Sequence, residues 1–296
     1  MLKNFRAYRV HSTWPDSEEA LSDQLAAAEF TPCNAFSEQS YGFEPPVDQA
    51  GGGLARRLSG ADLLQLRVQT RVLPTAVVKE SLAERVTAFT GRTGREPSRR
   101  EIRELKEEIY GELLPKALLK SDRVRGFYIQ QHKVLVVATP SAKVAELFQS
   151  RLRDGLGSLQ VTPLAFKQPV KKLLTEVFLG NSHAAFNLGR ECRMKDSSEP
   201  KSSVSWLDMD LQDGSVRKHV TDGLTIDRLG VNFDGVARFV LDEDVVVRKL
   251  RFEGLEALDE MDDEDPIARH DAEFTLEVGV TSRLLEALHK ELGGFA

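Results

Sequence analysis

The stretch PTAVVKESLAERVTAFTGRTGREPSRREIRELKEEIYGELLP, residues 74–115, decides the fold. Apolar residues recur in it at a spacing of three to four, on both sides of a break that contains two glycines and Pro97. The second half opens with Ser98-Arg99-Arg100-Glu101, an S-x-x-E capping box that typically begins a helix. Each half has one apolar stripe among many charges. We therefore predict two helices, from Pro74 to about Phe89 and from Ser98 to near Leu114-Pro115, which form a hairpin projecting from the body.

The segments on both sides of this hairpin mix strands and helices. Before it, strand alternation and helical spacing predict a strand over Asn4–Val10, a helix capped by Asp16, a loop over Phe36–Gly53 and a strand through Leu64, Leu66, Val68 and Val72. After it, they predict strands over Arg123–Gln130 and Lys133–Ala138, a helix from Ser141 to Arg153 that stops at Gly155, and a strand over Leu159–Leu164. The order of elements indicates an α+β body into which the hairpin is inserted.

A second α+β domain is expected beyond Pro169. It begins with a helix whose apolar face includes Leu173 and Leu174 and which ends at Gly180. Strands follow at Phe186–Met194, Val204–Leu207, Leu224–Phe233, Val236–Leu241 and Val245–Phe252. The tail is expected to form a strand over Ala272–Val280 and then a helix capped by Thr281 or Ser282. The predicted units are thus 1–73, 74–118, 119–168 and 169–296.

Composition describes an ordinary folded protein without a membrane span. The chain has 296 residues, 41% of them hydrophobic, and no apolar run approaches the roughly 20 residues that cross a bilayer. Its first residues include Lys3 and Arg6, so no apolar signal core is present and a cytoplasmic location is expected. Cys33 and Cys192 lie far apart in sequence, which predicts two buried thiols and neither a zinc site nor a disulfide framework.

Acidity is concentrated near the C-terminus. The formal charge is -6, but residues 241–273 alone carry -9 and the rest of the chain +3. A basic surface far from this acidic region can still hold phosphates, because salt screens charges beyond about 8 Å. The acidic residues 259–265 could in principle bind two divalent ions, but carboxylates adjacent in one run more often face water or a protein partner.

No motif for catalysis is present. The sequence has no G-x-x-x-x-G-K-[ST], G-x-G-x-x-G, H-E-x-x-H or G-x-S-x-G. Its six histidines are dispersed without the spacing of metal ligands, and Gly51-Gly52-Gly53 lacks the lysine of a phosphate loop. We therefore expect no catalytic residue, no metal site and no cofactor.

Three groups of basic residues point to phosphate binding. Lys116, Lys120, Arg123 and Arg125 have few acidic neighbours in sequence and are the preferred candidates, because such a cluster gains from counterion release on DNA. Arg99 and Arg100 can equally pair with glutamates of the same helix, so DNA contact and a solvated face both stay open. Lys171 and Lys172 form a weaker third group. No helix-turn-helix, zinc finger or aromatic-rich strand is present, which favours sequence-independent contact with the duplex backbone.

A series of short motifs resembles the bacterial recombination-associated RdgC family. The motifs occur in family order over roughly residues 1–180: Phe30-Thr31-Pro32-Cys33, Gly42-Phe43-Glu44-Pro45-Pro46, Leu113-Leu114-Pro115-Lys116-Ala117, Ser141-Ala142-Lys143, Leu156-Gly157-Ser158-Leu159, Pro163-Leu164 and Leu174-Thr175-Glu176. The resemblance weakens after them. That family consists of DNA-binding proteins.

The resemblance implies a horseshoe-shaped subunit that pairs at both ends into a ring dimer, with duplex DNA passing through a positively charged hole. On this chain, 74–118 corresponds to the tip, 1–73 and 119–168 to a mixed α/β centre, and 169–296 to the base. Leu118 or Leu119 falls where an apolar residue helps close the tip interface. The finger near the hole corresponds to Leu207-Asp208-Met209-Asp210, which is acidic here, so a DNA role for this finger is not expected.

The sequence therefore predicts a non-catalytic, nucleoid-associated homodimer that encloses double-stranded DNA. Restraint of RecA-promoted strand exchange is carried over from the family resemblance alone. Two alternatives remain: an acidic protein-interaction module that inhibits a recombinase directly, and a metal-dependent nuclease.

Overall fold

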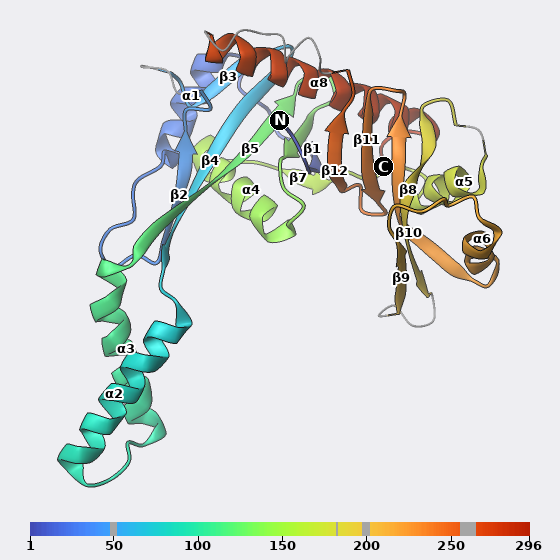
Figure 1. Cartoon of the computed structure of the whole chain (residues 1–296). Coiled ribbons are helices and arrows are strands. Elements are labelled where there is room, and N and C mark those ends of the chain that lie inside the picture. Colours follow the sequence, from blue (N-terminus) through green and yellow to red (C-terminus); the bar gives the residue numbers. More distant parts are fainter. Residues whose placement is uncertain (48–51, 182, 197–201, 255–264) are drawn as a thin grey trace.

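The computed structural model describes residues 1–47, 52–181, 183–196, 202–254 and 265–296. It confirms the α+β class: two antiparallel sheets lie side by side, and helices flank them (Figure 1). The first sheet has the order β2-β4-β5-β6-β1-β7, with β3 paired to β4, and the second has the order β12-β11-β10-β8-β9. The strands of the first sheet are β1 Arg6–Val10, β2 Gln39–Glu44, β3 Ala55–Leu58, β4 Ala61–Val72, β5 Leu118–Ile129, β6 Val134–Val137 and β7 Val161–Pro163. Those of the second are β8 Phe186–Asp196, β9 Ser203–Trp206, β10 Leu224–Phe233, β11 Ala237–Asp242 and β12 Val247–Phe252.

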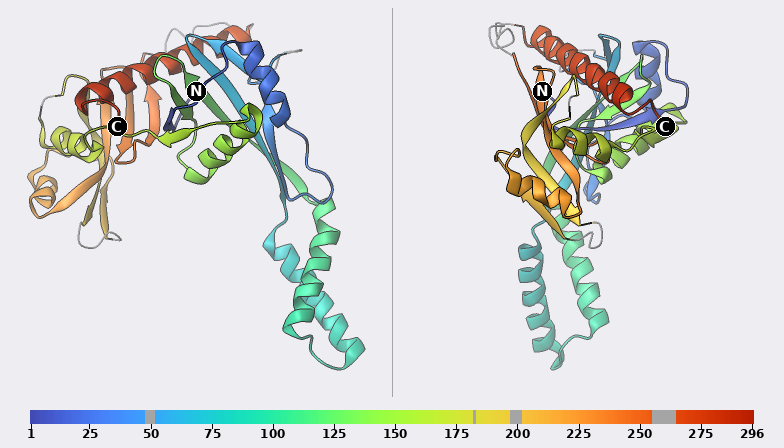
Figure 2. Two further views of the ribbon diagram at one scale, coloured as in Figure 1. Left: turned by 180° about the vertical axis from the view of Figure 1, so that it is seen from behind. Right: turned by 90° about the vertical axis from the view of Figure 1, so that its right-hand side faces the viewer.

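The helices fall into three groups. They are α1 Glu18–Leu25 and α4 Ala142–Leu156 on the first sheet, α2 Thr75–Thr93 and α3 Arg99–Leu113 in the hairpin, and α5 Val170–Leu179, α6 Gly214–Thr221 and α8 Pro266–Glu291. Short 3₁₀ turns occupy Ala26–Ala28 and Leu114–Lys116. Figures 1 and 2 show the hairpin standing clear of both sheets, as the sequence predicts.

Two hydrophobic cores hold the body together. One lies between the first sheet and helices α1 and α4, and includes Leu21, Phe43 and Phe148. The other joins the opposite face of the first sheet, α8, α5 and the second sheet, and includes Phe127 and Phe274. The second core is continuous from one sheet to the other, because α8 runs along both (Figure 1).

Backbone hydrogen bonds also join the sheets. Phe5 and Val247 exchange two, at 2.9 and 3.0 Å, and the Leu250 N–H donates to the Lys3 carbonyl at 2.8 Å. The residues that lead into β1 therefore extend the second sheet beyond β12.

The C-terminal segment corrects the sequence prediction. A strand over Ala272–Val280 and a separate helix were expected, but Pro266–Glu291 is one helix, α8. The Asp265 side chain caps it by accepting from the N–H groups of Ile267 and Ala268, and Pro266 occupies the first turn. Thr281, predicted to cap a helix, is buried in its middle. Phe274, Val278 and Val280, which suggested a strand, instead lie on the buried face of this helix, which packs against both sheets.

The expected loop over Phe36–Gly53 contains a strand. β2 pairs with β4 along six residues, from Gln39 opposite Thr70 to Glu44 opposite Gln65. Its centre passes close to a neighbouring segment, since a Cβ at Gly42 would lie 2.5 Å from backbone atoms of Phe30. The glycine that suggested a loop is thus required by this close approach.

Several helix ends also differ from prediction. Ser17, and not Asp16, caps α1. Helix α2 continues past Phe89 to Thr93 and ends at Gly94, whose φ of 69° suits a glycine. Helix α4 runs through Gly155 to Leu156, and Gly155 instead allows close packing, because a Cβ there would lie 3.1 Å from the Leu25 side chain.

Other predictions are confirmed. The capping box of Ser98 and Glu101 is present, α5 ends at Gly180, and both cysteines are buried. Within the described residues, no helix is long and apolar enough to cross a membrane.

Candidate nucleic-acid interface

A long two-stranded ribbon connects the hairpin to the body. β4 and β5 pair over twelve positions, from Ala61 opposite Ile129 to Val72 opposite Leu118. Their inner ends are buried in the cores, whereas their outer ends lead into α2 and out of α3. Since successive residues of a strand point to opposite faces, the outer half of the ribbon presents two different surfaces.

One face of the ribbon is polar and cationic. Its side chains come from alternate positions of β4, β5 and β2: Gln65, Arg67, Gln69, Arg71, Ser121, Arg123, Arg125, Ser40 and Glu44. This set, which we call the ribbon face, continues in the direction of α8, because its innermost cation contacts that helix.

Glu44 organises the middle of the ribbon face. Its carboxylate accepts from Arg123 at 2.6 Å and from the Gln65 amide at 3.0 Å, and lies 3.5 Å from Arg67. Arg67 also donates to Ser121 Oγ at 3.1 Å and stacks over Phe30, 4.6 Å from the ring centroid. Two guanidinium groups thus share one carboxylate, which leaves positive charge in excess at this position.

Arg71 anchors the root of the hairpin. Its guanidinium donates to the carbonyl oxygens of Leu114, Pro115 and Ala117 at 3.2 to 3.3 Å, and to that of Asn34 at 3.0 Å. These bonds join the turn that follows α3 and the segment around Asn34 to β4. Arg71 therefore fixes the exit of the hairpin onto β5 while keeping its charge.

Arg125 is held by a buried acid. Its Nη2 donates to Glu277 Oε2 at 3.0 Å, and the Glu277 side chain is only 1% exposed. Glu277 Oε1 accepts from the Leu2 N–H at 2.6 Å. Burial raises the pKa of Glu277, and the positive charge of Arg125 opposes this rise. Arg125 therefore ties β5 to α8, and its guanidinium is not free for a phosphate in this arrangement.

The four preferred cations do not gather on one surface, and two of them, Arg123 and Arg125, have acidic partners that are distant in sequence. Arg123 and Arg125 belong to the ribbon face, whereas Lys120 lies on the opposite face and pairs with Asp122 at 2.9 Å. Lys116 is exposed in the turn after α3 and has no carboxylate partner among the described residues. Only acidic residues close in the chain were considered from the sequence, whereas folding brings Glu44 to Arg123 and Glu277 to Arg125 from distant elements.

The two other predicted groups lie elsewhere. Arg99 and Arg100 stand at the start of α3, about 20 Å along the helix from its far end at 1.5 Å per residue. Arg100 pairs with Glu104 at 2.8 Å, whereas Arg99 has no such partner in the described part of the chain. Lys171 and Lys172 are on α5, where Lys172 lies 3.9 Å from Glu176. DNA contact by any of these residues stays a prediction.

The predicted tip leucines are exposed but point in opposite directions. Leu118 is 79% exposed and Leu119 is 47% exposed. Val72, directly opposite Leu118 on β4, is 43% exposed, so Leu118 and Val72 form one apolar pair on the face away from Arg71. Leu119 lies beside Arg71 on the ribbon face.

Sequence reasoning missed Arg67, Arg71 and Glu44. The alternation that predicted β4 contained the signal, because Leu64, Leu66 and Val68 define the core face and the residues between them define a polar face. The pairing of β2 and β5 with β4, which completes the ribbon face, is a tertiary feature.

The acidic elements of the sequence are only partly described. Of the acidic run 259–265, residues 259–264 lie outside the described residues, and Asp265 caps α8. Gly51 of the glycine run also lies outside the described residues. In the finger, Asp208 pairs with Arg190 at 2.8 Å. No group of three or more His, Cys, Asp or Glu side chains is placed to hold a metal ion within the described part of the chain.

Fold and surface define an α+β protein of two joined sheets with a projecting helical hairpin and cationic strand faces. The chain belongs to the RdgC family, since the family sequence model described as "Putative exonuclease, RdgC" matches residues 1–295. The recombination-associated protein RdgC of Aeromonas hydrophila is 32% identical over 295 residues, 99% of this chain and 97% of that protein. The protein of the same name from Shewanella oneidensis is 31% identical over 295 residues, with the same coverage. The family resemblance found in short motifs is confirmed and extends through the C-terminal region, where the motifs weaken.

Proposed function

We propose that this chain is a non-catalytic, sequence-independent double-stranded DNA-binding protein that forms a ring dimer and modulates RecA-type recombination. It acts in the cytoplasm on the nucleoid. The observation that carries the proposal is the match to the RdgC family over residues 1–295, together with the name of its relatives, which are recombination-associated proteins.

The outline of the subunit supports the ring. In Figure 1 the hairpin and the end of the second sheet near β9 extend to the same side of the molecule, and α8 spans the distance between the two sheets. The subunit is therefore an arch. Two arches that join at the hairpin and at the opposite end enclose DNA without reading its sequence, which agrees with the absence of a groove-reading motif.

The apolar pair Leu118 and Val72 supports a contact at the hairpin. Burying one leucine side chain against a partner contributes on the order of 1.5–3 kcal/mol. The double variant Leu118→Ser with Leu119→Ser should open this contact, while the dimer persists through the other end. Solution scattering measures the shape, and Leu179→Ser, an exposed leucine at the end of α5, is the control. A closed particle indistinguishable from the parent contradicts this assignment.

The cations at the hairpin root support phosphate binding. The plot of log K against log[salt] should have a slope of about -0.9 per phosphate neutralised and depend little on DNA sequence. Lys116→Glu with Lys120→Glu should weaken binding to all duplexes alike. A strong preference for one duplex at fixed salt contradicts the non-specific mode, and unchanged affinity of the double variant removes these two lysines from the interface.

Enclosure of DNA has its own test. A closed ring cannot leave a nicked circle by sliding off an end, so complexes on circles should survive added salt longer than complexes on linear DNA of the same length. Retention is measured on the circle and again after a single restriction cut. Equal loss before and after the cut means that DNA binds to an outer surface.

A second candidate, exonuclease activity, is favoured by the description of the RdgC family model, which names an exonuclease. Purified protein is incubated with end-labelled duplex DNA in the presence and absence of Mg²⁺. Release of nucleotides that depends on both protein and Mg²⁺ contradicts the non-catalytic proposal. Intact DNA that is retained by the protein supports it.

A further inference from the structure

We propose that the open face of the second sheet is a second phosphate-binding surface, which holds the backbone of double-stranded DNA. The inference rests on the proposed DNA binding and adds a site remote in sequence from the hairpin root. It comes from a groove of about 820 Å³, lined in part by charged side chains, that no motif indicated.

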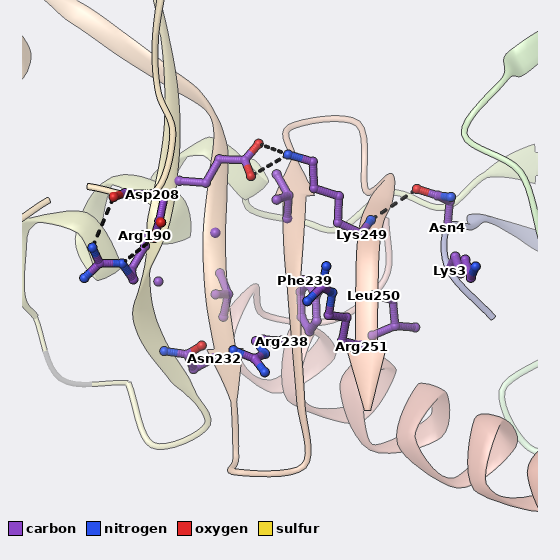
Figure 3. A pocket seen from close by; sticks show the side chains of 15 residues that line it. Lys3, Asn4, Arg190, Asp208, Asn232, Arg238, Phe239, Lys249, Leu250 and Arg251 are labelled. Carbon is purple, nitrogen blue, oxygen red and sulfur yellow. Dashed lines mark hydrogen bonds and ion pairs between the residues drawn. The ribbon is translucent and has the colours of Figure 1, made fainter. Parts of the chain in front are cut away.

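Among the described residues, helices cover one face of the second sheet and leave the other face open. Helices α5 and α8 pack on one face and bury residues such as Phe239 and Leu229 in the shared core. The other face carries the groove, whose lining comes from β8, β10, β11, β12 and the segment before β1 (Figure 3). An antiparallel sheet with one open face usually exposes polar side chains on that face. Polarity alone therefore does not indicate a binding site, whereas an excess of one sign of charge does.

Cations outnumber acids in this groove. Its lining includes five basic side chains and two acidic ones: Lys3, Arg190, Arg238, Lys249 and Arg251, with Glu191 and Asp208. Three of the cations are paired: Arg190 with Asp208 at 2.8 Å, Lys249 with Glu191 at 2.7 Å, and Arg238 with Glu253 at 2.8 Å. Lys3 and Arg251 have no carboxylate partner within the described ranges. The groove is therefore positively charged although the protein as a whole is acidic.

Two arginines occupy directly opposed positions in the sheet, and one of them, Arg238, also pairs with Glu253. Arg238 on β11 lies directly opposite Arg251 on β12, and Asn232 on β10 lies opposite Arg238, so the three form one row across the strands (Figure 3). Like charges at directly opposed positions destabilise a sheet. Glu253 offsets part of this repulsion through Arg238, and a polyanion over the row would offset the charge of Arg251, which has no carboxylate partner in the described part of the chain.

The middle of the groove allows close approach of a ligand. Gly189 and Gly230 lie side by side where β8 and β10 bulge, and a Cβ on Gly189 would lie 2.7 Å from the Gly230 backbone. Both positions therefore need glycine for the strand contact itself. The consequence is a floor without side chains, flanked by the arginine row and by Lys249.

The shape of the site selects an extended polyanion. The cations are spread over three strands and the N-terminal segment, and do not converge on one point as a small anion requires. From the segment before β1 to β8 there are four inter-strand spacings, about 19 Å in all, which corresponds to between five and six nucleotide steps of one DNA strand at about 3.4 Å of axial rise each. The one aromatic lining residue, Phe239, is buried in the core, so the groove offers no platform for stacking single-stranded bases.

Charge reversal at Arg251 allows the effect on DNA binding to be measured apart from any effect on folding stability. Arg251→Glu places a carboxylate opposite Arg238 and replaces a repulsive pair by an attractive one, so the melting temperature should stay the same or rise. Combined with Lys3→Glu, it should reduce the salt slope of duplex binding by about 2 and lower the affinity about tenfold or more at 0.1 M salt. The control is Lys218→Glu with Lys290→Glu, two exposed lysines on α6 and α8, which makes the same change in net charge.

Cross-linking locates the DNA directly. Cys33 and Cys192 are both buried, so a cysteine introduced by Asn232→Cys in the exposed arginine row can be labelled selectively with a photoactivatable group. Illumination with a random-sequence duplex should cross-link DNA to this position. A cysteine introduced by Lys218→Cys on α6 should give little product.

The outcomes distinguish the inference from the function on which it rests. If the parent protein binds no DNA, the proposed function fails and the groove proposal fails with it. If the parent binds DNA but the Arg251→Glu and Lys3→Glu protein behaves like its control and position 232 does not cross-link, only the groove proposal is overturned. Loss of affinity together with a lowered melting temperature is resolved by the cross-link, which forms in the otherwise intact protein only if DNA lies in the groove.

Discussion

The projecting hairpin and the part of the body that packs against α8 differ in the interactions that stabilise each of them. In the hairpin, Val78 is the one buried residue of α2 and Ile109 that of α3, with Pro97 buried in the turn between them, and local signals such as the Ser98 capping box set the helix ends. Helix α8 instead buries eight residues under two sheets. A change in the hairpin should therefore act locally, whereas a change under α8 should weaken the whole protein.

The largest expected effect is a cavity under α8. Phe274 is fully buried, and its ring lies 5.6 Å from that of Phe127 in an edge-to-face contact. Phe274→Ala should lower the free energy of unfolding by about 4 kcal/mol, because a large core side chain is lost and the space does not close. Guanidinium denaturation measures this, with Ile102→Ala on the half-exposed surface of α3 as the matched hairpin variant. Equal losses for the two variants contradict the proposed difference between the regions.

The next effect concerns the buried ion pair between body and ribbon. Arg125→Ala removes the nearer positive group from Glu277, whose carboxylate also lies 3.9 Å from the N-terminal ammonium, and should cost about 3 kcal/mol at pH 7. The pKa of Glu277 is already raised by burial and rises further without Arg125. A carboxyl whose pKa is raised in the folded state binds its proton more tightly there, so stability falls as pH rises above the ordinary value of 4.5.

The cost of Arg125→Ala should therefore be smaller at pH 4.5 than at pH 7. Urea denaturation at both pH values checks this, and Arg123→Ala, whose partner Glu44 is only partly buried, should show a smaller loss and a weaker pH dependence. A cost for Arg125→Ala that grows toward acid pH contradicts this role of Glu277.

A smaller loss of stability is expected when a helix-capping serine is removed, and the caps of α3 and α4 can be compared. The Ser98 side chain accepts from the Glu101 N–H at the start of α3, and that of Ser141 accepts from the Val144 N–H at the start of α4. Either serine replaced by alanine should cost about 1 kcal/mol. For Ser98→Ala the loss should appear as faster amide exchange confined to the first turns of α3, with an unchanged global midpoint. For Ser141→Ala it should shift the global midpoint, and the reverse pattern argues against a locally stabilised hairpin.

The smallest expected effect on stability comes from the hairpin root. Lys116→Glu with Lys120→Glu removes only an exposed pair with Asp122, so the free energy of unfolding should change by less than about 1 kcal/mol. Thermal melting followed by circular dichroism is the measurement. A larger loss means that these lysines stabilise the fold, and that weaker DNA binding by the double variant reflects this loss of stability.

Much of the fold followed from local patterns. The hairpin, the alternation of β4 and the five strands of the second sheet were predicted because their signals lie within a few residues of each other. Helix α8 was misassigned because its β-branched and aromatic residues favour strands locally, and only burial against both sheets determines its state. β2 was missed because its glycine is needed for contact with a segment outside the strand.

The candidate site residues also divide into those that local sequence patterns predict and those that only the tertiary structure brings together. Lys116 and Leu118 were found because the hairpin ends beside them in sequence, and their exposure follows from that position. The pairing of Arg125 with Glu277 spans 152 residues, so no local pattern contains it. The arginine row across β11 and β12 likewise arises from strand register.

By itself, the sequence determined the family, the α+β class and the helices of the hairpin, because motifs, caps and apolar stripes act over short distances along the chain. Tertiary structure alone decided that Arg123 and Arg125 are paired, because their partners Glu44 and Glu277 come from distant elements. It also decided that α8 is a helix, since the two sheets offer one continuous apolar surface that only a long helix covers.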